Sequence, residues 1–253
     1  MSSRDLAIDA KGILHLYNGT FDPYLSFYNP RTDQWAHVTT AGWSTVNNVS
    51  YGGIAVFEDT VFLTDMETAG PMDSLSGIVA IDTVSGTVTR FATSTAPEDL
   101  NLGLDGRLYS LSGSAVSIYD PKTFGLLDTV NLAFGSDYRS VSADAAGNMY
   151  LATWGGALIK SDPTGSLLDT IALPGSGMDV DISPTGLIAV GTRLDGVFIT
   201  DSDFSFSSGF DNGEWNSFVH FAPVPIPAAA WLFGGALVTL FARRRVARWM
   251  GKS

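Results

Sequence analysis

The chain has 253 residues, enough for one large all-β domain or two small ones, and its formal net charge of −12 is unevenly distributed. All 26 acidic residues precede Ala222, as do only nine of the 14 basic residues, so this body carries a net charge of −17. Such a body repels nucleic-acid phosphates and anionic lipid headgroups, which excludes nucleic-acid binding. The lack of cysteine excludes disulfides, thiol catalysis and zinc–thiolate sites.

A unit of four short strands recurs along the body about every 40 to 47 residues. In its two clearest copies, 98–132 and 138–173, an alternating strand is followed by a D-G or A-G-N turn, a second strand, a glycine loop, a third strand and the sequence LLDT. Asp-Gly and Gly-Asn between alternating apolar runs are strong hairpin signals. The same order fits 5–40, 54–93 and 178–210, with a weaker fourth strand in the last copy.

One polar position closes the third strand of every copy, and it is Asn29, Asp82, Asp120, Asp162 and Asp201 in turn. A recurrent carboxylate indicates either a ring of metal ligands or a turn that holds the hairpin of the third and fourth strands. We favour the turn, because Asn and Asp side chains accept hydrogen bonds from the backbone two residues further on.

Four antiparallel strands per repeat at this period are typical of a β-propeller blade, and no stretch before residue 223 has a helical apolar period. A double-sheet sandwich is the competing fold, but it does not require repeats of identical internal order. The pattern resembles the propellers of the NHL and YVTN type. We therefore expect an all-β propeller of about five to six blades in 1–211. Residues 212–223 are then either a closing strand, with WNSFVHF at 215–221, or a spacer.

The long loops of the repeats define a candidate ligand face. In a propeller, the loops between second and third strands, and those from one blade to the next, emerge on the same side. Aromatic planes with polar neighbours suit sugar rings, although such residues can instead plug the hub or cap blade ends. The candidates on this face are Tyr24, Trp43, Tyr51, Tyr138, Arg139, Trp154, Arg193 and Asp195.

The body contains no recognisable catalytic motif. His15, His37 and His220 are scattered, and a lone histidine on a strand is usually structural. Propeller lyases and lactonases hold a divalent metal at the hub with His, Glu, Asp or Asn, whereas this chain has only three His and four Glu. We expect no cofactor and no metal; calcium bound by the acid-rich segment 201–215 is the alternative, although that segment breaks the EF-hand spacing.

The chain ends in an uncharged segment followed by arginines. Residues 228–242 carry no charge, and counted from Val224 the run would span about 28 Å as a helix, enough for a bilayer core. Trp231 and Trp249 suit the two interfaces, and the basic tail 243–253 suits the cytoplasmic side. A buried core helix is the alternative, but this segment has no amphipathic face. The sequence predicts a transmembrane helix over 228–242.

These last thirty residues, 224–253, resemble the PEP-CTERM sorting signal recognised by exosortase. The sequence V-P-I-P-A-A-A-W-L-F-G, a short apolar helix and R-R-R occur in that order. The likeness is to the variant with Trp-Leu-Phe-Gly, since Ile226 replaces the Glu of Pro-Glu-Pro. The matching residues are Val224, Pro225, Pro227, Ala228, Ala229, Trp231, Leu232, Phe233, Gly234, Arg243, Arg244 and Arg245.

The resemblance implies an exported protein of a Gram-negative bacterium that makes exopolysaccharide. The inner membrane would hold the precursor by its helix, and exosortase would cleave near Pro225–Pro227 before release or attachment at the cell surface. Export needs an N-terminal signal, which MSSRDLAIDAKG does not provide, so we expect upstream sequence.

Three functions fit this reading. The first, which we favour, is a non-enzymatic surface or matrix protein linked to exopolysaccharide. The second is a lyase or hydrolase that acts at the propeller hub. The third is a protein-binding subunit of an envelope assembly.

Overall fold

The computed structural model describes residues 5–18, 25–38, 52–65, 77–91, 97–135, 137–210 and 218–221. All regular elements in these ranges are strands, and they form five four-stranded antiparallel sheets, each in simple chain order. Blade 1 contains β1 (Asp5–Ile8), β2 (Leu14–Tyr17), β3 (Leu25–Asn29) and β4 (Gln34–Val38). Blade 2 contains β5 (Ile54–Phe57), β6 (Thr60–Asp65), β7 (Gly77–Asp82) and β8 (Val88–Phe91). Blade 3 contains β9 (Asp99–Leu102), β10 (Leu108–Ser112), β11 (Ala115–Tyr119) and β12 (Leu126–Asn131). Blade 4 contains β13 (Tyr138–Ala143), β14 (Met149–Thr153), β15 (Ala157–Ser161) and β16 (Leu167–Ala172). Blade 5 contains β17 (Gly177–Ile182), β18 (Leu187–Thr192), β19 (Gly196–Asp201) and β20 (Ser207–Phe210).

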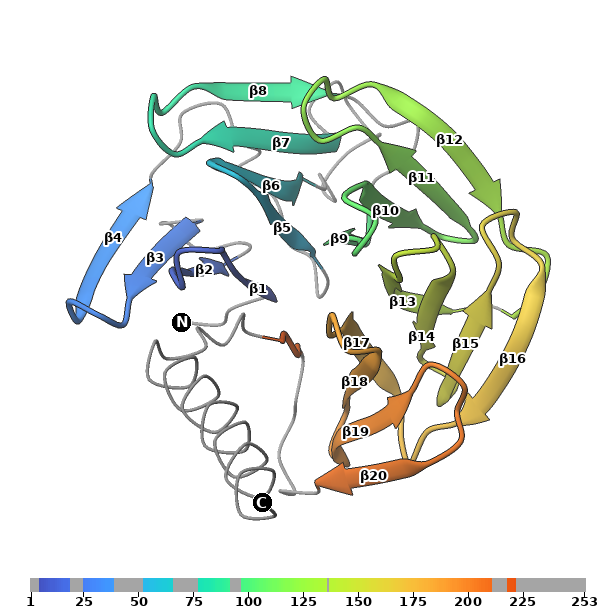
Figure 1. The fold of residues 1–253 in the computed structure, drawn as a ribbon. Helices are drawn as coiled ribbons and strands as arrows, with labels where there is room; N and C mark the ends of the chain where they lie inside the picture. Colours follow the sequence, from blue (N-terminus) through green and yellow to red (C-terminus); the bar gives the residue numbers. More distant parts are fainter. Residues whose placement is uncertain are drawn as a thin grey trace, which may run out of the picture. The chain divides into compact units, whose positions relative to one another are not determined.

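The first strands of consecutive blades lie side by side, from β1 through β5, β9 and β13 to β17. Figure 1 shows the blades following one another in chain order, with the first strand of each innermost and the fourth outermost. The expected all-β propeller is therefore confirmed, with five blades among the described residues.

The core consists of four apolar clusters, one between each pair of consecutive blades. Strand β14 shows how one strand contributes to the apolar clusters on both sides of its blade. Met149 and Leu151 pack into the cluster shared with blade 3, whereas Tyr150 and Ala152 pack into the cluster shared with blade 5. Successive side chains of a strand point to opposite faces, so a strand between two blades is apolar on both.

Buried aspartates also join the first strands of neighbouring blades. Asp5 accepts a hydrogen bond from the backbone N–H of Ile54 at 2.8 Å, and Asp99 accepts one from Val141 at 2.9 Å. Between blades 2 and 3, Gly53 permits close approach, because a Cβ at this position would overlap the backbone nitrogen of Leu100. These contacts hold the inner strands at a fixed separation.

Residues 218–221 make the same kind of contact with β17. The backbone N–H of Val219 donates to Asp179, and that of Phe221 donates to Asp181, both at 2.7 Å. This segment therefore contacts blade 5 as a following blade's first strand would.

Turns close the hairpins of the third and fourth strands as the sequence predicts. The side chains at the closing position each accept a backbone N–H, from Arg31 to Asn29, Val84 to Asp82, Lys122 to Asp120, Thr164 to Asp162 and Ser205 to Asp201. The recurrent polar position is thus confirmed as a turn residue.

The chain divides into two units, residues 1–221 and 222–253. The predicted transmembrane helix and every residue of the predicted sorting signal lie outside the described residues. Within the described ranges, no helix is long and apolar enough to cross a membrane.

Candidate functional site

One side of the propeller carries the loops between second and third strands and the connections between blades. We call this side the upper face. Three of the eight predicted ligand-face residues, Tyr24, Trp43 and Tyr51, lie outside the described residues. The other five come from blades 4 and 5, and the structure places them differently.

Arg139, Trp154 and Arg193 form one cluster, called here the upper-face cluster. The guanidinium carbon of Arg139 lies 5.2 Å from the centroid of the Trp154 ring, and that of Arg193 lies 5.1 Å from it. All three side chains are partly buried. Two arginines from different blades therefore converge on one indole.

Backbone contacts hold these residues in place. The N–H of Trp154 donates to the carbonyl of Asp137 at 2.9 Å, and that of Arg193 donates to the carbonyl of Ser176 at 2.9 Å. Trp154 lies in the turn between β14 and β15. Thr153 closes this turn, because its hydroxyl accepts a hydrogen bond from the N–H of Ala157 at 3.0 Å. The loops that present the cluster are thus tied to the strands on either side.

Carboxylates lie in the same region as the arginines. Glu98, just before β9, is partly buried, and this burial raises its pKa; Arg139 opposes the shift and Asp137 adds to it. Asp195 packs against Gly175, where a Cβ would overlap its Oδ2. The site therefore offers guanidinium donors beside carboxylate acceptors.

Tyr138 does not belong to this site. Its ring is only 2% exposed and packs in the apolar cluster between blades 3 and 4. The pairing of β13 with β14 shifts register between Tyr138 and Ser140, so Arg139 is an extra residue at this end of the strand, and its guanidinium lies over the indole.

Three buried carboxylates near the propeller axis were not predicted. Burial raises the pKa of Asp99 to about 6 and that of Asp179 to about 7. The pKa of Asp5 is raised well above its usual range by burial and by the charges of Asp179 and Asp99. Their recurrence at the same place in three first strands is a signal that the sequence carries.

The histidines also find specific partners. Nε2 of His15 lies 3.1 Å from Asp9, Nδ1 of His37 lies 3.0 Å from the Ser26 hydroxyl, and Nδ1 of His220 lies 3.2 Å from Asp181. In the described part of the chain, no group of three or more His, Asp or Glu is arranged to hold a metal ion. Of the proposed calcium segment, residues 211–215 lie outside that part.

No protein-family model matches the chain, and no curated protein matches it in sequence. Solved structures do match it in fold. A streptogramin B lyase superposes with a TM-score of 0.63 at 12% identity, covering 86% of this chain and 72% of its own. A gluconolactonase from Xanthomonas campestris gives 0.57 at 15% identity, covering 73% and 67%.

A third match is the extracellular domain of a one-component system from B. thetaiotaomicron, with a TM-score of 0.57 at 14% identity. It covers 87% of this chain and 31% of that one. The chain is a β-propeller. At these identities the likenesses establish the fold alone.

Proposed function

We propose that this protein is an exported, non-enzymatic binding propeller and that its upper-face cluster binds the hydroxyl-rich chains of an exopolysaccharide. The observation that carries the proposal is the convergence of Arg139 and Arg193 on Trp154. A cation held over an indole is oriented, so its N–H groups point in a defined direction.

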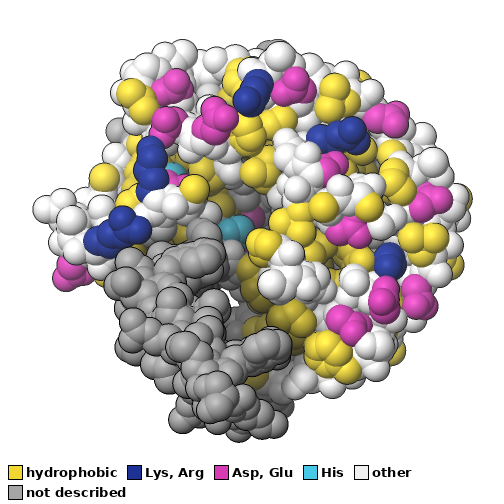
Figure 2. Space-filling model, viewed as in Figure 1, with side chains coloured by type: hydrophobic (Ala, Val, Ile, Leu, Met, Phe, Trp, Pro, Cys, Tyr) yellow, Lys and Arg dark blue, Asp and Glu magenta, His cyan; other side chains and the backbone are white. Residues whose placement is uncertain are grey.

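The mixture of charges favours a neutral sugar over a polyanion. Guanidinium groups donate hydrogen bonds and carboxylates such as Glu98 accept them, which together match the paired donors and acceptors of neighbouring sugar hydroxyls. The body carries a net charge of −17, which repels a polyanion at long range. Figure 2 shows acidic side chains spread across the visible face of the blades, with fewer basic ones between them.

The binding proposal is tested by comparing two double variants of equal charge change. Arg139→Ala with Arg193→Ala alters the upper-face cluster, whereas Arg107→Ala with Lys122→Ala removes two exposed charges elsewhere. In gels that contain exopolysaccharide isolated from the protein's native cells, we expect the first variant to bind about tenfold more weakly than wild type. The second should bind as wild type does, and equal binding by all three proteins would refute the proposal.

We also propose that exosortase processes the C-terminal segment. The support is the sequence itself: prolines at 223, 225 and 227, an uncharged run and the arginines at 243–245. The prolines would present an extended backbone to the protease, and the arginines would remain cytoplasmic.

Intact mass spectrometry of protein recovered from its native cells tests this step. Loss of the residues after about Pro227 would support processing, and a full-length mass in the membrane fraction would contradict it. This outcome is independent of sugar binding, because the upper-face cluster lies in the body.

A further inference from the structure

A cavity of about 500 Å³ lies between blades 1 and 2. Its walls come from the β1–β2 turn, from β2, β3 and β4, and from Thr83 in the β7–β8 turn. These turns lie at the ends of the blades opposite the upper face, so the cavity is distinct from the upper-face cluster. Its volume is that of a small-ligand site.

The cavity contains an oriented histidine. One carboxylate oxygen of Asp9 accepts the backbone N–H groups of Lys11 and Ile13, both at 2.8 Å. The other oxygen lies 3.1 Å from Nε2 of His15. A carboxylate oxygen accepts hydrogen bonds, so Nε2 carries the ring proton and Nδ1 keeps its lone pair. Burial lowers the pKa of His15, which keeps the ring neutral near pH 7.

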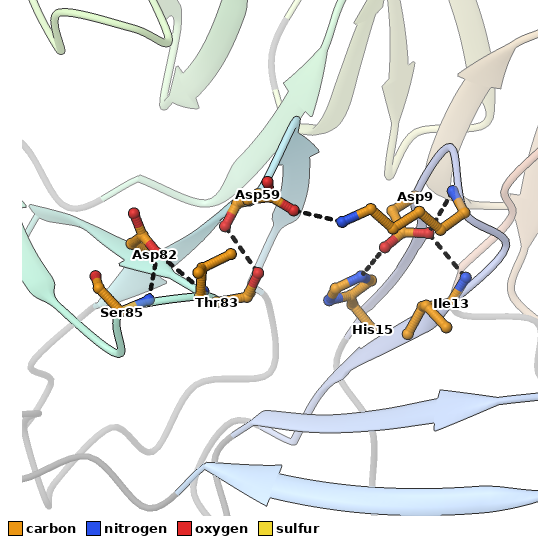
Figure 3. Close-up of polar contacts among 9 residues, drawn as sticks. Asp9, Ile13, His15, Asp59, Asp82, Thr83 and Ser85 are labelled. Carbon is orange, nitrogen blue, oxygen red and sulfur yellow. Dashed lines mark hydrogen bonds and ion pairs between the residues drawn. The ribbon is translucent and has the colours of Figure 1, made fainter.

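Nδ1 of His15 accepts no hydrogen bond from the described residues. His15 is only 3% exposed, and its Nδ1 has no hydrogen-bond partner among the described residues. Figure 3 shows this nitrogen turned away from Asp9. A buried acceptor without a donor costs about 1–3 kcal/mol. Nδ1 has almost no accessible surface in the free protein, so a ligand hydroxyl that donates to it would gain this contact by displacing the groups that cover it.

The rest of the cavity offers apolar and polar walls together. Phe27 meets the His15 ring edge to face, with centroids 5.0 Å apart. Ile13, Ala36 and Val38 add apolar surface, whereas Asn29, Gln34 and Thr83 add side chains that donate and accept hydrogen bonds. Apolar CH faces and hydroxyls occur together in sugars, which this combination matches.

An exposed ion pair joins the two blades beside the cavity. Lys11 on blade 1 reaches Asp59 on blade 2, with Nζ 2.5 Å from Oδ1. The backbone N–H and the hydroxyl of Thr83 both donate to the Asp59 carbonyl, at 2.8 and 2.9 Å. Figure 3 shows these contacts in a row, from Asp9 and His15 to Asp59 and Thr83. With His15 neutral, Lys11 together with the carboxylates of Asp9 and Asp59 leaves one net negative charge at this end of the blades, which disfavours an anionic ligand.

We propose that this cavity is a second ligand site, which binds one or two uncharged sugar units with a hydroxyl donating to Nδ1 of His15. The site is built from blades 1 and 2 alone. It does not depend on the upper-face proposal.

The test titrates the full chain with methyl α-D-glucopyranoside, methyl α-D-mannopyranoside and methyl β-D-galactopyranoside, each up to about 10 mM, the weak end of the affinity scale. Binding is followed by calorimetry and by the ring nitrogen resonances of ¹⁵N-labelled histidine. We expect one of these sugars to bind and to shift the Nδ1 resonance of His15. His15→Phe keeps an aromatic ring and should weaken binding about tenfold.

Two further variants make the result specific. Gln34→Ala alters a side chain at the cavity and should also weaken binding, whereas Trp154→Ala, in the upper-face cluster, should not. The proposal is overturned if none of the three sugars binds, or if His15→Phe and Gln34→Ala both bind as wild type does. Should His15→Phe fail to fold, Gln34→Ala and the His15 resonance decide: an unshifted resonance in saturated wild type overturns the proposal.

Discussion

Aspartate has two structural roles in this chain, at hairpin turns and at buried positions near the axis. Its pKa is lowered in the first role and raised in the second. At the hairpin turns, backbone N–H groups donate to exposed carboxylates and lower the pKa of Asp82 and Asp120. Near the axis, burial raises the pKa of Asp99 and Asp179, although each also accepts backbone hydrogen bonds. Desolvation therefore outweighs hydrogen bonding where the carboxylate is fully enclosed.

The axial aspartates predict an unusual pH dependence of stability. A carboxyl whose folded pKa is raised favours folding when protonated, so its contribution is fully present below pH 4 and is lost as the pH rises through the folded value. Asp179, with a pKa of about 7, should make the fold about 1 kcal/mol less stable at pH 8 than at pH 6. Urea unfolding at the two pH values measures this difference.

Asp179→Asn is the matched variant, because asparagine keeps the size of the side chain and one carbonyl acceptor. We expect the difference in unfolding free energy between pH 6 and pH 8 to shrink in this variant. A difference as large as that of wild type would show that another group titrates. His15, whose pKa is lowered by burial, acts in the opposite sense, and chiefly below its ordinary value of about 6.5.

Contacts between residues that are close in sequence can be predicted, whereas contacts between blades cannot. The turn position of the third strand is predictable because its partners lie only two to four residues away. The pairing of Asp99 with Val141 joins residues 42 positions apart in different blades, and no local pattern reports it. The contact of His15 with Asp9 lies within one hairpin, where His15 is opposite Ala7, so the period of two along the strand places Asp9 on the same face as His15.

At the scale of the element, burial rises and falls with the place of a strand in its blade. Every residue of β14, a second strand, is buried, whereas β16, the fourth strand of the same blade, is exposed along almost its whole length. Both strands are rich in apolar residues, so composition alone does not separate them. The difference follows from the position of β14 between two other blades.

Two leucine substitutions in blade 4 measure this difference. Leu151 on β14 is fully buried, whereas Leu168 on β16 is 51% exposed. We expect Leu151→Ala to lower the free energy of unfolding by about 2–5 kcal/mol, because it leaves a cavity in the core. Leu168→Ala should change it by about 0.5 kcal/mol or less. Equal effects in urea unfolding would contradict the assignment of inner and outer strands.

The order of strands within a blade could be predicted from the sequence, because each strand pairs with the next strand along the chain. Each blade is a meander of hairpins, so turn residues and alternating side chains predict it one step at a time. The upper-face cluster was predicted in part for the same reason, since strand direction decides on which face a loop emerges. Contacts between side chains of different blades, such as Arg139 and Arg193 on the Trp154 ring, required the structure.

At the scale of the whole molecule, the propeller carries two separate candidate sites. Blades 4 and 5 build the upper-face cluster, and blades 1 and 2 build the cavity at their opposite ends. With both proposed sites, one molecule would contact two polysaccharide chains and link them. Such a role would agree with the cell-surface destination that we propose from the C-terminal segment.

Hydrogen exchange measured by mass spectrometry, with and without the exopolysaccharide of the source organism, tests the central claim most directly. We expect slower exchange of backbone amides in 137–140, 153–156 and 192–196, the segments that present the upper-face cluster. The turns at 120–125 and 162–166, at the other end of blades 3 and 4, should exchange at unchanged rates. Protection confined to those turns, or no protection at saturating polysaccharide, would contradict the account.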